Sequence, residues 1–298
     1  MITILPQEAT QTRENPTYSS ISRVCNGLNV LYFPFSETSP GGSAVHAVGG
    51  FLALGGCLVL GPRYGRFRRD GSTRDIPGHS LPLASLGAFL LWIGWLGFNA
   101  GSTNADFSDL GRIVLTTHLA AAAGIVGAIG LQALQRKPIL MTTVINGALG
   151  GLVSITAGAK YIDPAGALLI GLFAGAIVVL GSALLRRFQI DDVVDAVPVH
   201  GFCGIYGTLM VGLLPADRAF DWHFLGIQAL GAGTAALWAF SCGWLIFTLI
   251  DKTIGIRAPT DHEQTGLDYT EHYELGYPEF MAIRTHRAVD GRASEGQS

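Results

Sequence analysis

Long apolar runs separated by short polar links make up most of this 298-residue chain. Each run has about 20 residues, the length at which an α-helix crosses the apolar core of a bilayer. The pattern predicts an all-α integral membrane fold with seven transmembrane helices, at residues 41–61, 80–101, 112–134, 139–159, 164–185, 194–214 and 225–250. It divides the chain into an atypical segment 1–40 that we expect to be poorly ordered, a membrane domain 41–250 and a polar tail 251–298 with some structure.

Prolines support these boundaries. Proline is typical of helix ends and first turns, where its missing N–H costs nothing. Prolines lie at the ends of the runs at Pro62, Pro138, Pro164 and Pro215, and Pro82 falls in a first turn. Pro198 instead lies a few residues into its run and predicts a local break or tilt there.

Composition agrees with a membrane protein. Hydrophobic residues make up 49% of the chain and charged residues only 14%, and 40 residues are glycine, which membrane helices use for close contact. The net charge of −3 gives no indication of nucleic-acid binding. The four cysteines form neither a metal-binding spacing nor a disulfide framework, so we interpret them as free thiols, at Cys25, Cys57, Cys203 and Cys242.

The basic residues predict an orientation. Alternate links carry most of them: Arg63, Arg66, Arg68, Arg69 and Arg74; Arg136 and Lys137; Arg186 and Arg187. The other side carries only Arg112, Lys160 and Arg218. Cytoplasmic links are enriched in lysine and arginine, so seven crossings put the tail from Lys252 in the cytoplasm and the N-terminus outside.

Three histidines fall well inside the runs, where a polar group is costly unless it is paired or lines a cavity. His118 follows two threonines, and we interpret it as satisfied by a backbone carbonyl or a neighbouring hydroxyl. His46, in V-H-A-V-G-G, and His200, in V-H-G-F-C-G, have similar surroundings. The glycines allow another backbone to approach closely, which would bring the two rings together. Burial favours neutral imidazoles that can share a proton and hydrogen bond a small polar molecule.

The segment L-L-W-I-G-W-L-G-F-N-A-G-S, residues 90–102, has two interpretations. Trp92 and Trp95 could anchor the helix at the membrane interface as an aromatic belt. Alternatively, Phe98 and Ser102 could form an outer vestibule, because aromatic faces attract cations and a hydroxyl accepts hydrogen bonds.

The segment F-Q-I-D-D-V-V-D-A-V-P-V-H leads to His200. Asp191 and Asp192 open the helix, where its dipole favours anions, so we expect them to cap it. Asp195 lies five residues before His200, and we expect a structural role for it, as a bridge to a neighbouring helix or to N-terminal amides.

Four segments together resemble the ammonium transporter family (Amt/Mep, related to the Rh proteins). They are G-G-S-A-V-H-A-V-G-G with G-P-R-Y-G-R-F; L-L-W-I-G-W-L-G-F-N-A-G-S; I-D-D-V-V-D-A-V-P-V-H-G-F-C-G-I-Y-G-T; and G-L-D-Y-T-E-H-Y-E-L-G-Y-P-E-F. They occur in family order and cover the chain from about residue 38 to 280.

The resemblance implies an eleven-helix fold of two inverted five-helix repeats plus a final helix, a plan that recurs in transporters. It implies a homotrimer with a pore in each subunit, and the seven runs resemble helices five to eleven. It further implies that His46 and His200 are the paired pore histidines, that Phe98 belongs to the outer gate and that Ser102 recruits ammonium. Asp195, Asn99 and Trp95 are then structural residues near the pore.

The implied function is ammonium transport for nitrogen uptake. Ammonium loses a proton near the vestibule, and ammonia and the proton pass the pore separately. The resemblance implies no enzymatic activity, no cofactor and no metal. Its implied partners are ammonium or ammonia, the lipid bilayer and a PII signal protein at the cytoplasmic tail of a multi-pass cell-membrane protein.

The chain also departs from the family pattern. The family's first four helices have no counterpart here, and residues 1–37 match nothing in the family. An aspartate normally stands eight residues before the first pore histidine, but this chain has Thr38 there, after Glu37. We therefore expect a truncated form, and an inactive one if the missing helices are essential.

Two other classes remain as alternatives. A seven-helix receptor of the retinal-binding kind needs a lysine deep in its last helix, and residues 225–250 contain none. An intramembrane metal-binding enzyme could use His46, His200 and Cys203, but no carboxylate deep within the runs would support them.

Overall fold

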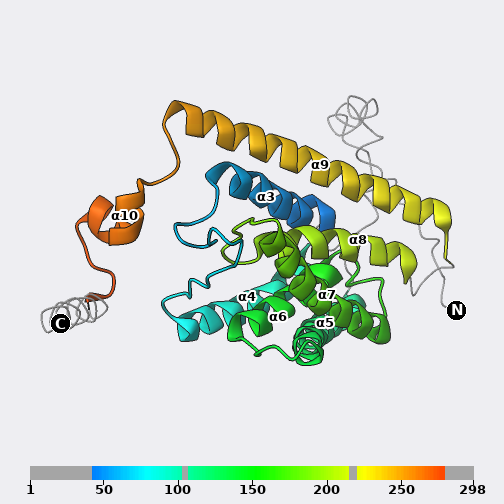
Figure 1. Cartoon of the computed structure of the whole chain (residues 1–298). Helices are drawn as coiled ribbons and strands as arrows, with labels where there is room; N and C mark the ends of the chain where they lie inside the picture. Colours follow the sequence, from blue (N-terminus) through cyan, green and yellow to red (C-terminus); the bar gives the residue numbers. More distant parts are fainter. Residues whose placement is uncertain (1–41, 103–106, 215–219, 279–298) are drawn as a thin grey trace, which may run out of the picture.

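The computed structural model of the chain describes residues 42–102, 107–214 and 220–278 (Figure 1). Within those ranges the regular secondary structure is helical, apart from one isolated β-bridge between Phe67 and Thr73. The membrane part consists of η2 (Gly42–Ala47) with α3 (Val48–Leu60), α4 (Leu81–Gly101), α5 (Phe107–Leu134), α6 (Met141–Thr156), α7 (Pro164–Arg187), η3 (Val197–Phe202) with α8 (Cys203–Leu213), and α9 (Trp222–Thr253). The tail adds α10 (Thr260–Thr265) and α11 (Leu267–His272).

These elements confirm the prediction of an all-α membrane fold. Five of the helices are long and apolar enough to cross a membrane, and two shorter apolar helices span Met141–Thr156 and Val197–Leu213. The seven coincide with the seven apolar runs. The atypical segment 1–40 and Pro215 lie outside the described residues.

Helix boundaries follow from local side chains. The Ser80 hydroxyl accepts a hydrogen bond from the Leu83 amide at the start of α4, and Asp163 does the same for the Gly166 amide at the start of α7. Asp221 caps α9 through the His223 amide. Each cap satisfies an amide that the first helical turn would otherwise leave unpaired.

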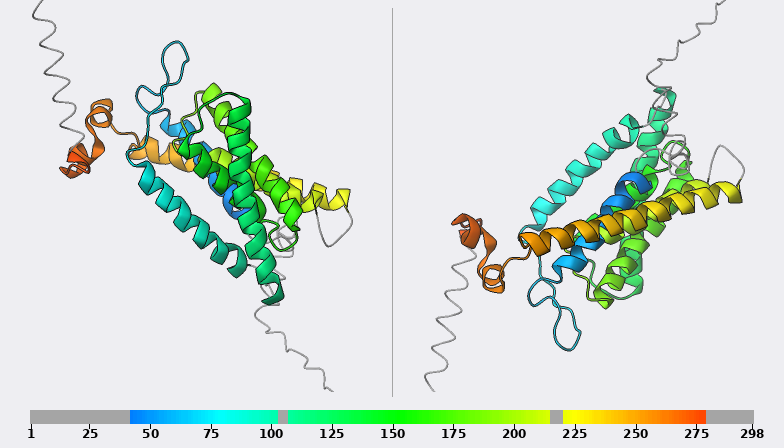
Figure 2. Two further views of the ribbon diagram at one scale, coloured as in Figure 1. Left: turned by 90° about the horizontal axis from the view of Figure 1, so that it is seen from below. Right: turned by 90° about the horizontal axis from the view of Figure 1, so that it is seen from above.

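Glycines let the central helices α5, α6 and α7 touch backbone to backbone. A Cβ atom added to Gly151 of α6 would lie 2.1 Å from the carbonyl oxygen of Ala120 in α5, and one added to Gly171 of α7 would lie 2.2 Å from the same oxygen. Figures 1 and 2 show this group on one side of α3, with α9 running along the other side. The buried core of the molecule lies among α5, α6, α7 and the start of α8.

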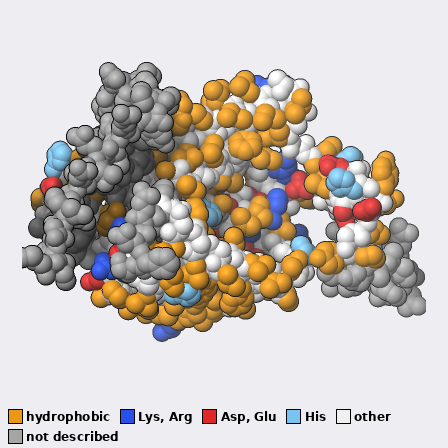
Figure 3. Space-filling view, turned by 180° about the vertical axis from the view of Figure 1, so that it is seen from behind, with side chains coloured by type: hydrophobic (Ala, Val, Ile, Leu, Met, Phe, Trp, Pro, Cys, Tyr) orange, Lys and Arg blue, Asp and Glu red, His pale blue; other side chains and the backbone are white. Residues whose placement is uncertain are grey.

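Helices α4 and α9 leave large apolar faces uncovered. Phe89 of α4 is 63% exposed and Trp238 of α9 is 71% exposed, and Figure 3 shows hydrophobic side chains spread over the face that it presents. Apolar faces of this extent suit lipid tails or other apolar helices.

The basic links gather on one side of the molecule. Arg63, in the link after α3, pairs with Asp191, in the link after α7. Arg257, which follows α9, contacts the end of α3. Both contacts put links that the positive-inside rule assigns to the cytoplasm on the same side as the tail.

Candidate functional site

Each histidine of the predicted pair lies in a π-helical segment that opens its helix. His46 is in η2, which continues into α3, and His200 is in η3, which continues into α8. Pro198 lies near the start of η3, so the local departure from α-helical geometry that it predicted takes the form of a π-helical turn. Such segments are rare and are frequent at functional sites.

The structure brings the two rings into contact. Nδ1 of His200 lies 3.3 Å from Nδ1 of His46, and the ring centroids are 5.4 Å apart with an interplanar angle of 21°. His46 is buried, with 8% of its surface exposed, and His200 is half-buried.

Gly50 makes this contact possible, because it lets α3 approach the backbone of Gly201 in η3 without a side chain between them. A Cβ atom added to Gly50 would lie 2.1 Å from the backbone nitrogen of Gly201. Gly50 follows His46 in sequence and has the role that the sequence predicted, whereas a Cβ atom on Gly201 would lie 3.5 Å or more from its neighbours.

Helix α4 supplies an aromatic wall beside His46. Trp95 stacks on the His46 ring at a centroid distance of 5.1 Å and an interplanar angle of 12°, and Phe98 lies 5.7 Å from it. The Trp95 indole N–H donates to the Thr156 hydroxyl of α6 at 2.8 Å. Trp95 is buried in the site rather than exposed in an aromatic belt, whereas Trp92 lies beside His118.

The end of α4 holds the two remaining predicted residues. Asn99 is buried, and its amide donates to the Thr117 hydroxyl of α5 at 3.0 Å, which fixes α4 against α5. Ser102 is the C-cap of α4, one turn beyond Phe98, whose carbonyl accepts from the Ser102 amide. Residues 103–106, which follow it, lie outside the described ranges.

Aspartates fix the start of η3, the segment that carries His200. The Asp192 carboxylate accepts from the amides of Ala196 and Val197, as predicted for a cap, and burial raises its pKa. Asp195 has a left-handed backbone (φ 59°), and its carboxylate accepts from the Ser182 hydroxyl of α7 and the Asn146 amide of α6. Asp195 therefore ties η3 to α6 and α7.

The expectation that Asp191 also caps this helix was wrong, because its carboxylate binds arginines of another link instead of the amides that Asp192 caps. The Asp191 carboxylate pairs with the Arg63 guanidinium at 2.7 Å and with that of Arg66 at 3.3 Å. Burial acts to raise the pKa of Asp191, but hydrogen bonds from Arg63 and the charges of both arginines outweigh it and hold the pKa below its usual range. The only sequence signal for this ion pair was that Arg63 and Asp191 have opposite charges and that their links lie on the same predicted side of the membrane.

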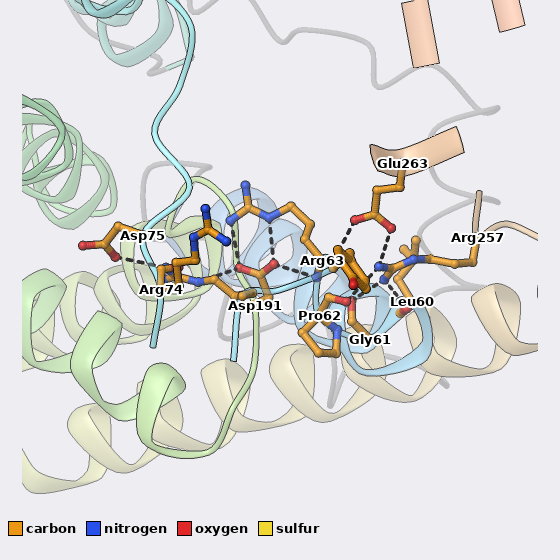
Figure 4. A network of polar contacts seen from close by, with 11 residues as sticks. Leu60, Gly61, Pro62, Arg63, Arg74, Asp75, Asp191, Arg257 and Glu263 are labelled. Atoms are coloured by element: carbon orange, nitrogen blue, oxygen red, sulfur yellow. Dashed lines mark hydrogen bonds and ion pairs between the residues drawn. The ribbon is translucent and has the colours of Figure 1, made fainter. Parts of the chain in front are cut away.

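A second set of contacts joins the tail to the same link (Figure 4). The Arg257 guanidinium donates to the carbonyls of Leu60, Gly61 and Pro62, which α3 leaves unpaired at its C-terminal end. Arg257 also pairs with Glu263 of α10 at 2.8 Å, and Glu263 accepts from the Tyr64 amide. We call this set, Arg257, Glu263 and Tyr64 with the end of α3, the tail clasp.

The histidine pair has open hydrogen-bonding capacity. A hydrogen bond between two Nδ1 atoms requires one ring to donate and the other to accept, so one Nε2 is then an acceptor and the other a donor. Nε2 of His46 is buried and has no partner in the described part of the chain. A buried polar atom without a partner is costly, and a small polar guest would satisfy it.

Other candidate groups lie apart from this arrangement. His118 is exposed, and its Nδ1 lies 2.9 Å from the Val114 carbonyl of its own helix. The Cys203 thiol points to the Ala174 carbonyl. Among residues 42–102, 107–214 and 220–278, no three His, Cys, Asp or Glu side chains come close enough to hold a metal ion.

Comparisons with known proteins agree with one another. Residues 31–277 match the Ammonium Transporter Family. The chain is 39% identical to the ammonium transporter Amt2 of Archaeoglobus fulgidus over 262 residues, which are 82% of this chain and 56% of that protein. It is 38% identical to Amt2 of Methanocaldococcus jannaschii over 281 residues, 89% of this chain and 65% of that one.

Solved structures give the same result. A Sensor Amt Protein superposes with a TM-score of 0.77 at 35% identity, covering 81% of this chain and 61% of that one. Mep2 of Candida albicans superposes with a TM-score of 0.69 at 28% identity, covering 78% of this chain and 55% of that one. The chain spans about half the length of the curated relatives it matches.

Proposed function

Because the chain belongs to the ammonium transporter family, we propose that it serves ammonium transport across the membrane through a passage lined by His46 and His200. The observation that carries this proposal is the contact between the two Nδ1 atoms at 3.3 Å, beside a buried Nε2 of His46 without a partner in the described residues. Paired neutral imidazoles offer both a donor and an acceptor to a small nitrogen compound.

The proposed sequence of events begins at the end of α4. Ser102 recruits ammonium, Phe98 gates the entrance, and ammonium loses its proton near the vestibule. Ammonia and the proton then pass separately, with the proton shared between His46 and His200. Trp95 and Asn99 hold α4 in place through Thr156 and Thr117, and Asp195 holds η3.

The family further suggests the setting of this activity. We propose a homotrimer in the cell membrane, with domain limits near 41 and 250, the tail in the cytoplasm and a PII signal protein as its partner there. The enrichment of arginine in the links on the side of the tail supports this orientation.

The test is uptake of labelled methylammonium, an ammonium analogue, by vesicles that contain the chain. We expect His200→Ala to reduce uptake to background because the shared proton has lost one of its two acceptors. His118→Ala is the matched control, since His118 bonds only its own helix backbone, and it should leave uptake unchanged. Normal uptake by His200→Ala would refute the shared-proton mechanism.

A second form of the experiment allows for the length of the chain. Residues 42–278 replace the matching segment in Amt2 of Archaeoglobus fulgidus, which gives a hybrid with a complete set of family helices. We expect the hybrid to take up methylammonium and to lose this activity with His200→Ala. Uptake by the hybrid but not by the unmodified chain would mean that the helices supplied by the relative are essential.

A further inference from the structure

A cavity lies between the link after α3 and the tail, away from the histidine pair. Its volume is about 580 Å³, within the range of small-molecule sites. The link supplies most of its wall, including Arg63, Tyr64 and Arg74, and α10 supplies Glu263 and Gln264. The tail clasp joins the two parts of the wall, because the Tyr64 amide donates to Glu263.

Most charges on this wall are already compensated. Arg63 pairs with Asp191, Asp75 pairs with Arg66 at 3.0 Å, and Glu263 pairs with Arg257. The Arg74 guanidinium is different: it has no ion pair or hydrogen bond with any residue that the structure describes, although the Arg74 backbone is held by Arg66. The cavity wall therefore carries one cation, the exposed Arg74 guanidinium, that no described residue compensates, on a backbone held by Arg66.

The rest of the wall indicates the kind of anion. Ile76 and Pro77 lie next to Arg74 on the wall, and they offer an apolar surface that an inorganic ion does not need. The cavity adjoins the C-terminal end of α3, where the helix leaves the predicted membrane region. A guanidinium binds a phosphate group with two parallel hydrogen bonds.

We propose that this cavity binds a phosphate ester, with the Arg74 guanidinium contacting the phosphate and Ile76 and Pro77 contacting the organic part. Two sources carry this chemistry, a lipid headgroup with a phosphate monoester and a soluble phosphate ester. Because Glu263 and Gln264 of α10 form part of the wall, the ligand contacts both the link and the tail and stabilises their association.

The experiment measures binding by the purified full chain and does not depend on transport. Glycerol 3-phosphate is titrated calorimetrically for the soluble source, and phosphatidic acid, which carries the same headgroup, is counted by native mass spectrometry for the lipid source. We expect Arg74→Gln to weaken the binding of one of these two ligands by at least about tenfold, or about 1.4 kcal/mol. The backbone contacts of residue 74 do not involve its side chain, so the variant should melt like the parent.

The matched control is Arg69→Gln, which removes the same charge from the same link at a position outside the cavity wall. Binding that depends on Arg74 but not on Arg69 supports the proposal, and the arm that shows it identifies the source. Equal losses in the two variants would reduce the effect to general attraction by a basic link and overturn the proposal. The proposal is also overturned if Arg74→Gln changes binding of neither glycerol 3-phosphate nor phosphatidic acid, or if succinate binds as tightly as these phosphate esters.

Discussion

At the residue scale, one glycine determines whether two histidines can meet. Gly50 leaves room for direct contact between α3 and the backbone of Gly201 in η3, and His46 and His200 then share a hydrogen bond. Backbone contact of this kind tolerates no added carbon, because closely packed interiors relax only partly around extra volume.

We therefore predict that Gly50→Ala separates the pair. The added Cβ would lie 2.1 Å from the Gly201 nitrogen, and relief of that overlap costs roughly 1–3 kcal/mol. Methylammonium uptake by the hybrid should fall to background, and the thermal midpoint of the chain should fall as well.

Gly49→Ala is the control for this prediction. Gly49 is the adjacent residue, it is exposed, and a Cβ atom there meets nothing within 4 Å. The uptake and the thermal midpoint of the Gly49→Ala variant should match those of the parent. If Gly50→Ala behaves in the same way, the close approach is not required for the site.

The sequence predicted these residues but not all of their neighbours. The likeness of V-H-A-V-G-G to V-H-G-F-C-G identified both histidines, because a costly polar group in an apolar run is conspicuous. The stacking of Trp95 on His46 was not predicted, since an aromatic belt gives the same sequence pattern. The contact depends on how α4 packs against α6, through the hydrogen bond from Trp95 to Thr156.

At the scale of elements, the tail clasp connects three segments that are far apart in sequence. Arg257 after α9 caps the carbonyls at the end of α3, and Glu263 of α10 receives the Tyr64 amide of the following link. The same link reaches Asp191 before η3 through Arg63. Polar contacts therefore run from the tail to the segments that begin or end the two histidine-bearing helices.

The clasp predicts a pH dependence of tail docking. The hydrogen bond from the Tyr64 amide lowers the pKa of Glu263, burial opposes this effect, and Arg257 adds to the lowering, so that the pKa lies below its usual value. A lowered pKa means that the ionised carboxylate stabilises docking fully above its ordinary value of 4.5, and that this contribution is lost as the pH falls through the lowered pKa.

A spin label at Thr265 would measure this effect as an increase in mobility at acid pH. Glu263→Gln should show roughly threefold to fivefold more of the mobile form already at pH 7, because a partly exposed ion pair contributes about 1 kcal/mol or less. Glu271→Gln, in the exposed part of α11, should behave like the parent. Equal mobility in all three proteins would contradict the role given to Glu263.

Helix positions were predictable from sequence because a bilayer imposes both length and apolarity on each crossing. The clasp was not predictable in this way. It consists of charged residues in links, whose partners depend on how the helices are arranged, and the sequence indicates only that Arg63, Asp191 and Arg257 lie on the same predicted side.

At the scale of the whole molecule, the distribution of charge and apolar surface indicates how the protein sits in a membrane. Broad apolar faces are exposed on α4 and α9, and basic links and the tail lie at one end. At the other end, Lys160 pairs with Asp109 at 3.1 Å. The two ends therefore differ in charge, which is the asymmetry that orients membrane proteins.

We predict that the tail is cytoplasmic. Green fluorescent protein fused after residue 298 should fluoresce in a bacterial host, and alkaline phosphatase fused at the same position should be inactive because it folds only after export. Fusions in the link between α6 and α7, after Lys160, should give the opposite result. A tail fusion with high phosphatase activity would reverse the orientation.

The π-helical turns that carry His46 and His200 have a consequence for how these sequences can change. Each contains one residue more per turn than an α-helix would. A wider turn absorbs its extra residue, so deletion of a single residue there would restore ordinary α-helical winding with little rotation of the residues on either side. In these two turns, a change in the number of residues therefore acts mainly on the turn that carries the histidine, and the flanking segments stay nearly in place.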